Sequence, residues 1–171
     1  MIRTFTGKLV DPFNPDPNTI DIIDIAHGLS NICRYGGQCS RFYSVAEHCC
    51  YVSDASPEGS KLAALLHDAS EAYIGDMIQP LKDSGRLGAF ETIEDDLQFI
   101  IRSKLSAPCN WNMVNHIDIA IREEEIAALF NPSNPVENKY LPASHDIGFD
   151  PETAKTMFLR RYNLLTKKRT A

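Results

Sequence analysis

Apolar side chains recur every three or four residues along most of the chain, which is the spacing of an amphipathic helix. The pattern predicts helices over residues 20–31, 44–53, 60–73, 90–105 and 112–130, and a last helix that begins at Pro151. Strict alternation of apolar and polar residues, which is typical of strands, is confined to 2–10 and, more weakly, to 41–45. We therefore predict an all-α protein with at most a small β element near the N-terminus.

Residues at the ends of these segments support the predicted helices. Ser44 and Glu47 have the spacing of a capping box, and Gly75 suits the end of the segment that precedes it. Proline and asparagine gather in 11–19 and in 130–144, which predicts loops there.

Length, composition and charge are those of an ordinary globular domain. The chain has 171 residues, of which 43% are hydrophobic and 23% charged, with a formal net charge of -6. Proteins bind nucleic acid through a positively charged surface, so this negative net charge argues against a nucleic-acid partner. No apolar stretch approaches the ~20 residues that cross a bilayer. We expect one domain over residues 1–171 and no membrane partner.

Cysteine usage indicates a reducing compartment. The count is odd, no pair has the C-x-x-C spacing, and the first residues lack the apolar run of a signal peptide. We therefore expect a cytoplasmic protein whose cysteines mostly serve as small buried packing residues. The five are Cys33, Cys39, Cys49, Cys50 and Cys109.

Histidines and aspartates interrupt the apolar pattern in three of the predicted helices. His48 stands beside an apolar stripe, His67 and Asp68 interrupt the segment LAALLHDASEAY, and Asp118 takes an inward position in a later helix. One inward histidine is usually a hydrogen-bonded core residue. A buried carboxylate, however, is costly unless a cation or several donors satisfy it. Two imidazoles and two carboxylates directed inward together predict a shell for one divalent metal ion.

These residues and their surroundings resemble the H…HD…D signature of the HD-domain metal-dependent phosphohydrolases. The resemblance rests on SVAEH around His48, HDASEAYIGD from His67, QPLK after it, and Asp118, and it covers about residues 20–130. It implies a helical bundle that hydrolyses phosphoester bonds, commonly in nucleotides. His48, His67, Asp68 and Asp118 would hold a divalent ion such as Co²⁺, Mn²⁺, Zn²⁺, Fe²⁺ or Mg²⁺.

Two further acidic residues follow the HD pair. Glu71 is four residues after His67 and three after Asp68, so we expect its carboxylate to share their helix face. In the deoxynucleotide-directed branch of the family, the residue that Glu71 resembles orients the attacking water. The residue that Asp76 resembles acts in proton transfer near the scissile bond. The alternative interpretation is a solvated surface glutamate and a turn aspartate.

The same branch suggests three substrate-binding residues. Arg34 resembles the arginine of an Arg-aromatic pair that meets the phosphate, with Tyr35 as the ring beside the sugar and base. Lys82, in QPLK, resembles a lysine near the phosphate tail. The alternative interpretation of each is a surface residue.

The segments DIAHGLSNICRYGG and FYSVAEH are most similar to small phage members of the family. They favour a deoxynucleoside triphosphate triphosphohydrolase with dATP as the leading substrate, releasing deoxynucleoside and triphosphate, with Mg²⁺ accompanying the triphosphate. A 5'-deoxynucleotidase acting on monophosphates and a non-catalytic nucleotide-binding HD module stay as alternatives. The resemblance also implies a homo-oligomer and, for a phage-encoded protein, the host cytoplasm.

Two other histidines need an interpretation. His27 lies in the first of these segments, where we expect it to line the nucleotide pocket, to brace Arg34 or to be structural. His145 and Asp146 form a second HD dipeptide between Pro142 and Gly148, and we interpret it as incidental because it lies in a predicted loop.

Overall fold

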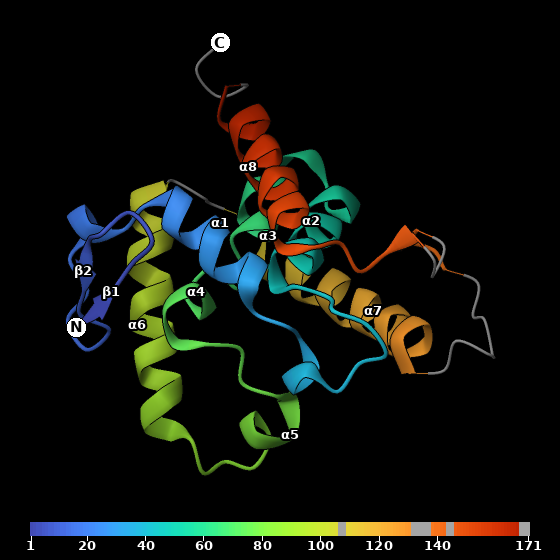
Figure 1. Ribbon diagram of the computed structural model, residues 1–171, viewed down its shortest axis with the longest axis horizontal. Coiled ribbons are helices and arrows are strands. Elements are labelled where there is room, and N and C mark those ends of the chain that lie inside the picture. The colour runs from blue at the N-terminus through green and yellow to red at the C-terminus, as the bar shows by residue number, and fades with distance from the viewer. Residues whose placement is uncertain (106–108, 131–137, 143–145, 168–171) are drawn as a thin grey trace.

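The computed structural model describes residues 1–105, 109–130, 138–142 and 146–167, and it is mostly helical with a small N-terminal hairpin, as predicted (Figure 1). The hairpin pairs β1 (Ile2–Arg3) with β2 (Leu9–Val10) in antiparallel register. The helices are α1 (Ile22–Asn31), α2 (Val45–Ala55), α3 (Lys61–Leu65), α4 (Glu71–Ile74), α5 (Gln79–Lys82), α6 (Gly88–Leu105), α7 (Trp111–Phe130) and α8 (Pro151–Lys167). None of these helices is long and apolar enough to cross a membrane.

The weak strand prediction over 41–45 is wrong. In this region the structure forms only an isolated bridge between Cys33 and Ser44. The predicted capping box at the start of α2 is half right, because the Ser44 hydroxyl accepts a hydrogen bond from the Glu47 backbone N–H. The Glu47 side chain does not return the bond. It accepts instead from the backbone N–H groups of Gly148 and Phe149, which pack against this end of α2.

The predicted helix over 60–73 is right at its two ends and wrong in its middle, where it breaks into α3 and α4 with turns between them. Gln98, a buried residue of α6, stabilises the break by meeting two backbone groups that a continuous helix would have satisfied itself. Its amide donates to the Leu66 carbonyl at 2.6 Å and accepts from the Ser70 N–H at 2.9 Å. His67 and Asp68 therefore lie on a turn. Adjacent residues on a helix point about 100° apart, so leaving the helix frees both side chains to face the same point.

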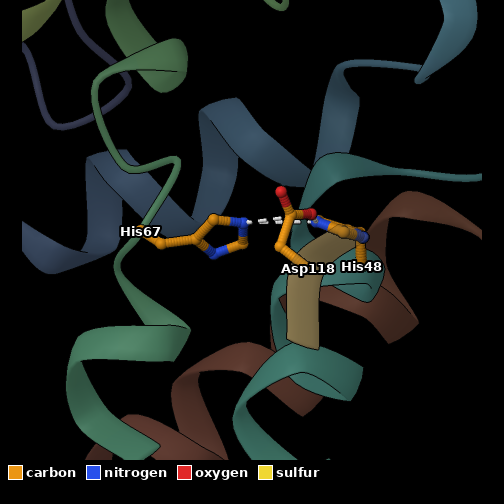
Figure 2. Close-up of side chains that lie close together, drawn as sticks. All are labelled: His48, His67 and Asp118. Atoms are coloured by element: carbon orange, nitrogen blue, oxygen red, sulfur yellow. Dashed lines mark hydrogen bonds and ion pairs between the residues drawn. The ribbon is translucent and has the colours of Figure 1, made fainter. Parts of the chain in front are cut away.

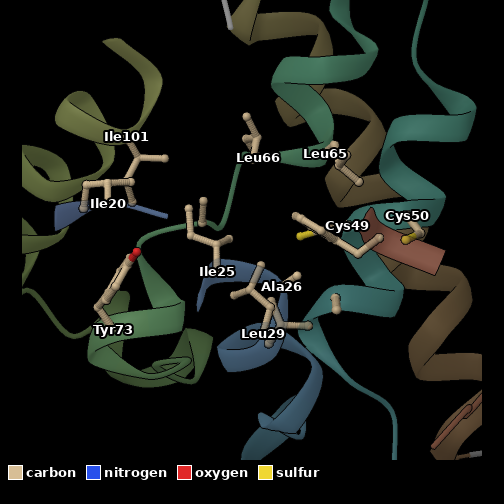
Figure 3. Packing of buried hydrophobic residues seen from close by; sticks show 14 of the residues in the cluster. Ile20, Ile25, Ala26, Leu29, Cys49, Cys50, Leu65, Leu66, Tyr73 and Ile101 are labelled. Carbon is tan, nitrogen blue, oxygen red and sulfur yellow. The ribbon is translucent and has the colours of Figure 1, made fainter. Parts of the chain in front are cut away.

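The core forms where α8 crosses α1, α2 and α3. Figure 3 shows Ile25, Ala26 and Leu29 of α1 facing the cysteines of α2, with Leu65 and Leu66 nearby. Cys49 and Cys50 are fully buried packing residues as predicted, whereas Cys33, Cys39 and Cys109 are half-buried. A second cluster packs α7 against α2. α2 is thus held on both sides.

Helix α1 also lies unusually close to α4. A Cβ added at Gly28 would stand 2.7 Å from the Ala72 carbonyl oxygen, so only glycine permits this approach. The contact holds α4, which begins at Glu71, against the body of the protein.

Candidate metal centre

Four side chains from three parts of the fold meet at one point. His48 comes from α2, His67 and Asp68 from the turn after α3, and Asp118 from α7. The His48 Nε2 atom lies 3.0 Å from Asp118 Oδ1 and 3.2 Å from His67 Nε2, as Figure 2 shows for these three residues. The His67 Nε2 atom lies 3.1 Å from Asp68 Oδ2. The structure therefore brings together all four residues that the sequence predicted as ligands.

Hydrogen bonds on the far side of each ring direct the two Nε2 atoms inward. The His48 Nδ1 atom lies 2.6 Å from Glu125 Oε1, and the His67 Nδ1 atom lies 2.7 Å from the Ala64 carbonyl oxygen. Both partners are acceptors, so each Nδ1 carries a hydrogen and each Nε2 is the atom left to bind a metal ion. The two Nε2 atoms face each other at 3.2 Å, a contact that is favourable only with a proton or a metal cation between them.

The electrostatics of the centre favour a cation. Burial raises the pKa of Asp68, but the neighbouring His67 and His48 outweigh it and hold that pKa at about 2. The pKa of Asp118 is likewise depressed by the two histidines in spite of its burial. Two imidazole nitrogens and two ionised carboxylates form a ligand set that suits a divalent transition metal. His48, His67 and Asp118 offer ligand atoms that lie within 4.8 Å of one another and could hold a metal ion.

Cys49 forms an alternative group with His67 and Asp68. Its Sγ atom faces His67 Nδ1 at 3.8 Å, but this nitrogen already donates to the Ala64 carbonyl. Burial raises the pKa of the Cys49 thiol to about 11, which keeps it protonated near neutral pH. A thiol binds metal as the thiolate, so the histidine and carboxylate group is the better candidate.

A cavity of about 600 Å³ opens beside this centre and is lined by both predicted catalytic acids. Glu71 is 3% exposed, and its Oε2 atom has no hydrogen-bond partner among the described residues. Burial, together with the charges of Asp68 and Asp76, raises the pKa of Glu71 well above its usual value. The pKa of Asp76 is also raised, chiefly by burial. Both acids are therefore poised to hold protons next to the centre.

Arg34 and Tyr35 line the same cavity, but each is tied to a carboxylate. The Arg34 Nε and Nη2 atoms both lie 3.2 Å from Glu125 Oε2, whereas Nη1 lies 3.7 Å from Asp68 Oδ2. The Tyr35 hydroxyl donates to Glu125 at 2.6 Å, and its ring meets Phe130 edge to face at 5.3 Å. Tyr35 presents an aromatic wall rather than a free hydroxyl.

The backbone after Arg34 turns sharply to bring this wall into place. Tyr35, Gly36 and Gly37 have positive φ values of 58°, 60° and 73°. This left-handed region is unfavourable for residues with a Cβ, so the two glycines are required by the turn itself.

Lysine and arginine from α5 and α7 complete the cavity. The Lys82 Nζ atom lies 3.0 Å from Glu94 Oε1 and 3.7 Å from Glu71 Oε1. Arg122, which the sequence analysis did not identify, also lines the cavity and donates from Nη1 to Gln79 Oε1 at 2.9 Å. Arg122 lies four residues, or one helical turn, after Asp118, and this spacing could have identified it from the sequence.

Glu125 is the second residue that sequence reasoning missed. It belongs to the run of acids at 123–125, which has the appearance of a solvated helix face. Its spacing of seven residues from Asp118 places it on the same side of α7. A histidine that binds metal through one nitrogen usually donates from the other to an acceptor, so a search for the partner of His48 would have led to it.

His27 is not part of this site. Its ring stacks on Phe5 with centroids 4.0 Å apart, and it lines a separate cavity of about 330 Å³ beneath the N-terminal hairpin. It neither lines the main cavity nor braces Arg34, so its structural interpretation fits best. His145 lies outside the described residues.

The chain is similar to two proteins that are both described as uncharacterized. The chain is 35% identical over 176 aligned positions to the uncharacterized protein YfdR of Escherichia coli (strain K12), covering 98% of this chain and 97% of YfdR. It is 40% identical over 115 positions to the uncharacterized protein RCAP_rcc00048 of Rhodobacter capsulatus, covering 62% of this chain and 58% of that one. No protein-family profile matches the chain. The protein therefore belongs to the same family as YfdR.

Proposed function

We propose that this protein is a metal-dependent HD-type phosphohydrolase that cleaves deoxynucleoside triphosphates, dATP first among them, into deoxynucleoside and triphosphate. The observation that carries the proposal is the meeting of four side chains, His48, His67, Asp68 and Asp118, beside a cavity of about 600 Å³ that the two aspartates line. A ligand set with this chemistry, open on one side to a cavity, is what a hydrolytic metal centre requires.

The bound cation would supply a Lewis acid for the phosphoryl group and lower the pKa of a coordinated water. The side chains around it have complementary tasks. Glu71 lines the cavity and its Oε2 atom has no hydrogen-bond partner among the described residues, so its carboxyl group can accept a hydrogen bond from the attacking water and orient it. Arg34 keeps Nη1 free of Glu125 and directed toward Asp68, where it can donate to a phosphoryl oxygen.

Asp76 completes the proposed reaction. Hydrolysis breaks the bond between the 5'-oxygen and the α-phosphorus, so the departing oxygen needs a proton. Asp76 has a raised pKa and can donate that proton from its carboxyl group. Water then supplies the hydroxyl that stays on the phosphorus, and the products are a deoxynucleoside and triphosphate.

The lining of the cavity supports a nucleotide with a long phosphate chain. Arg122 adds a third cation to Arg34 and Lys82, and it donates a hydrogen bond to the neutral Gln79 side chain. Apolar residues on the cavity wall offer a surface on which a base can rest. They include Ile78, Ile126 and Phe130.

A 5'-deoxynucleotidase that acts on monophosphates is the second candidate. Arg34 and Lys82 are each paired with a carboxylate, namely Glu125 and Glu94. Their charges are therefore partly neutralised, and a shorter anion would suit the cavity better. The products discriminate between the two, because a triphosphohydrolase releases triphosphate from dATP and a nucleotidase releases orthophosphate from dAMP.

The test is a screen of all deoxynucleoside mono- and triphosphates with Co²⁺, Mn²⁺, Zn²⁺, Fe²⁺ or Mg²⁺ supplied. We expect Asp68→Ala to lose bound metal and activity together. Glu71→Ala should keep the metal and lose turnover by roughly 10²-fold or more. Asp96→Ala, at an exposed carboxylate of α6, is the matched control and should equal the parent. Metal-loaded parent protein that is inactive on every nucleotide would refute the proposal and leave a nucleotide-binding module.

A further inference from the structure

Glu125 accepts side-chain hydrogen bonds on both of its carboxylate oxygens, inside the protein. It is fully buried on α7, and four side chains donate to it. Oε1 meets His48 Nδ1 at 2.6 Å and the Tyr43 hydroxyl at 2.7 Å. Oε2 meets the Tyr35 hydroxyl at 2.6 Å and two guanidinium nitrogens of Arg34 at 3.2 Å.

The two oxygens of Glu125 serve different halves of the site. Oε1 fixes His48, whose other nitrogen faces the metal centre. Oε2 fixes Arg34 and Tyr35, which line the cavity beside that centre. Because a carboxylate is planar and rigid, rotating it to relieve one set of bonds would break the other set.

The geometry of Arg34 shows what this bonding achieves. The Nε and Nη2 atoms of its guanidinium group both contact Glu125. Nη1 does not, and it lies 3.7 Å from Asp68 Oδ2. The Nε2 atom of His48 lies 3.7 Å from the same Asp68 oxygen. One glutamate therefore sets the direction of two groups that converge on one point from different elements.

We infer that Glu125 is a positioning residue that aligns the metal ligand His48 and the phosphate-binding Arg34 as one unit. The alignment of His48 is inferred from the hydrogen bonds of Glu125 alone. The role of Arg34 in binding phosphate rests on the proposed function. Removing Glu125 as an acceptor should therefore weaken two separable properties at once, namely metal affinity and the binding of a phosphate chain at saturating metal.

The decisive variant is Glu125→Gln, which keeps the shape but replaces one acceptor oxygen by an NH₂ group. The NH₂ group is itself a donor, so it would meet the hydrogen-bond donors on one side of residue 125 without accepting from them. Glu125→Asp is the second variant, because it keeps the negative charge that neutralises the buried Arg34 but is too short to meet both sets of donors. The matched control is Glu47→Gln, at another fully buried glutamate, whose side chain bonds to Tyr51, Gly148 and Phe149 rather than to residues of the metal centre or the cavity lining.

Metal binding is measured by titrating each protein with Co²⁺ and following its absorption spectrum. We expect both Glu125 variants to bind Co²⁺ roughly 10- to 100-fold more weakly, with an altered spectrum because the His48 ring is reoriented. Glu47→Gln should match the parent in affinity and spectrum. A Glu125→Gln protein, or a folded Glu125→Asp protein, with the affinity and spectrum of the parent would overturn the inference.

Phosphate binding is measured at saturating Co²⁺ by calorimetry with inorganic triphosphate. We expect weaker binding in the Glu125 variants and unchanged binding in Glu47→Gln; unchanged binding in the Glu125 variants would overturn the inferred alignment of Arg34. A parent protein that binds Co²⁺ but hydrolyses no nucleotide would refute the proposed function without bearing on how Glu125 aligns His48. Conversely, an active parent with unaltered Glu125 variants would refute the positioning role while leaving the hydrolase intact.

Discussion

Glu47 and Glu125 are both fully buried glutamates, yet the protein uses them in opposite ways. Glu47 accepts hydrogen bonds from the backbone N–H groups of Gly148 and Phe149 at 2.9 Å and from the Tyr51 hydroxyl at 3.1 Å. All three donors are neutral. Burial therefore dominates and raises the pKa of Glu47 in spite of these bonds.

The surroundings of Glu125 give the opposite result. Burial again raises the pKa, but the positive charge of Arg34 and the contact with His48 outweigh it, and the pKa of Glu125 falls to about 2. The comparison teaches that burial alone does not identify a functional carboxylate, whereas its partners do. Glu47 fastens the segment before α8 to the start of α2, and Glu125 holds the side chains of the candidate site.

The largest expected effect comes from removing each carboxylate outright. Glu125→Ala leaves a buried guanidinium without its counter-charge, so we expect it to lower the free energy of unfolding by about 3–5 kcal/mol. Glu47→Ala leaves only neutral donors unpaired and should cost roughly 1–3 kcal/mol. Urea unfolding in the presence of a chelator measures both without a contribution from metal.

Glu123→Ala is the control for this pair, because Glu123 is an exposed neighbour on α7. We expect its free energy of unfolding to stay within about 0.5 kcal/mol of the parent. A larger loss in Glu47→Ala than in Glu125→Ala would show that the charged partners of Glu125 do not set the energetic difference between the two sites.

The next largest effect is on the stability gained by binding metal, which should differ between variants of the two glutamates. A cation at 100 times its dissociation constant raises the free energy of unfolding by about 2.7 kcal/mol. We expect this gain in the parent and in Glu47→Gln. A 10- to 100-fold loss of affinity in Glu125→Gln would shrink it to about 0.4–1.4 kcal/mol at the same metal concentration. Thermal unfolding across a Co²⁺ series measures the gain, and an equal gain in both variants would contradict the comparison.

The sequence predicted the four residues of the metal centre because each breaks an apolar pattern. An ionisable residue in a buried stripe is visible without any knowledge of its partner. His48 and Asp118 were placed correctly for this reason, on the inward sides of the helices now seen as α2 and α7. The main helices were predictable from the same periodicity.

The sequence did not reveal features that depend on contacts between distant segments. The break between α3 and α4 is stabilised by Gln98 from α6, and the burial of Glu47 depends on a segment about a hundred residues away. Glu125 was hidden for the same reason, since an acidic run on a helix normally faces solvent. Only the arrangement of the helices shows which of its three acids is enclosed.

The smallest expected effect compares two tyrosines that donate to these glutamates. Tyr43 lies 2.7 Å from Glu125 Oε1, and Tyr51 lies 3.1 Å from Glu47 Oε1. A hydrogen bond to an ionised acceptor contributes more than one between neutral groups. We therefore expect Tyr43→Phe to lower the free energy of unfolding by about 1 kcal/mol more than Tyr51→Phe does. Urea unfolding of the two variants at neutral pH measures this difference. Equal losses would mean that the charges around Glu125 do not strengthen its hydrogen bonds, and the contrast between the two buried carboxylates would then rest on metal binding alone.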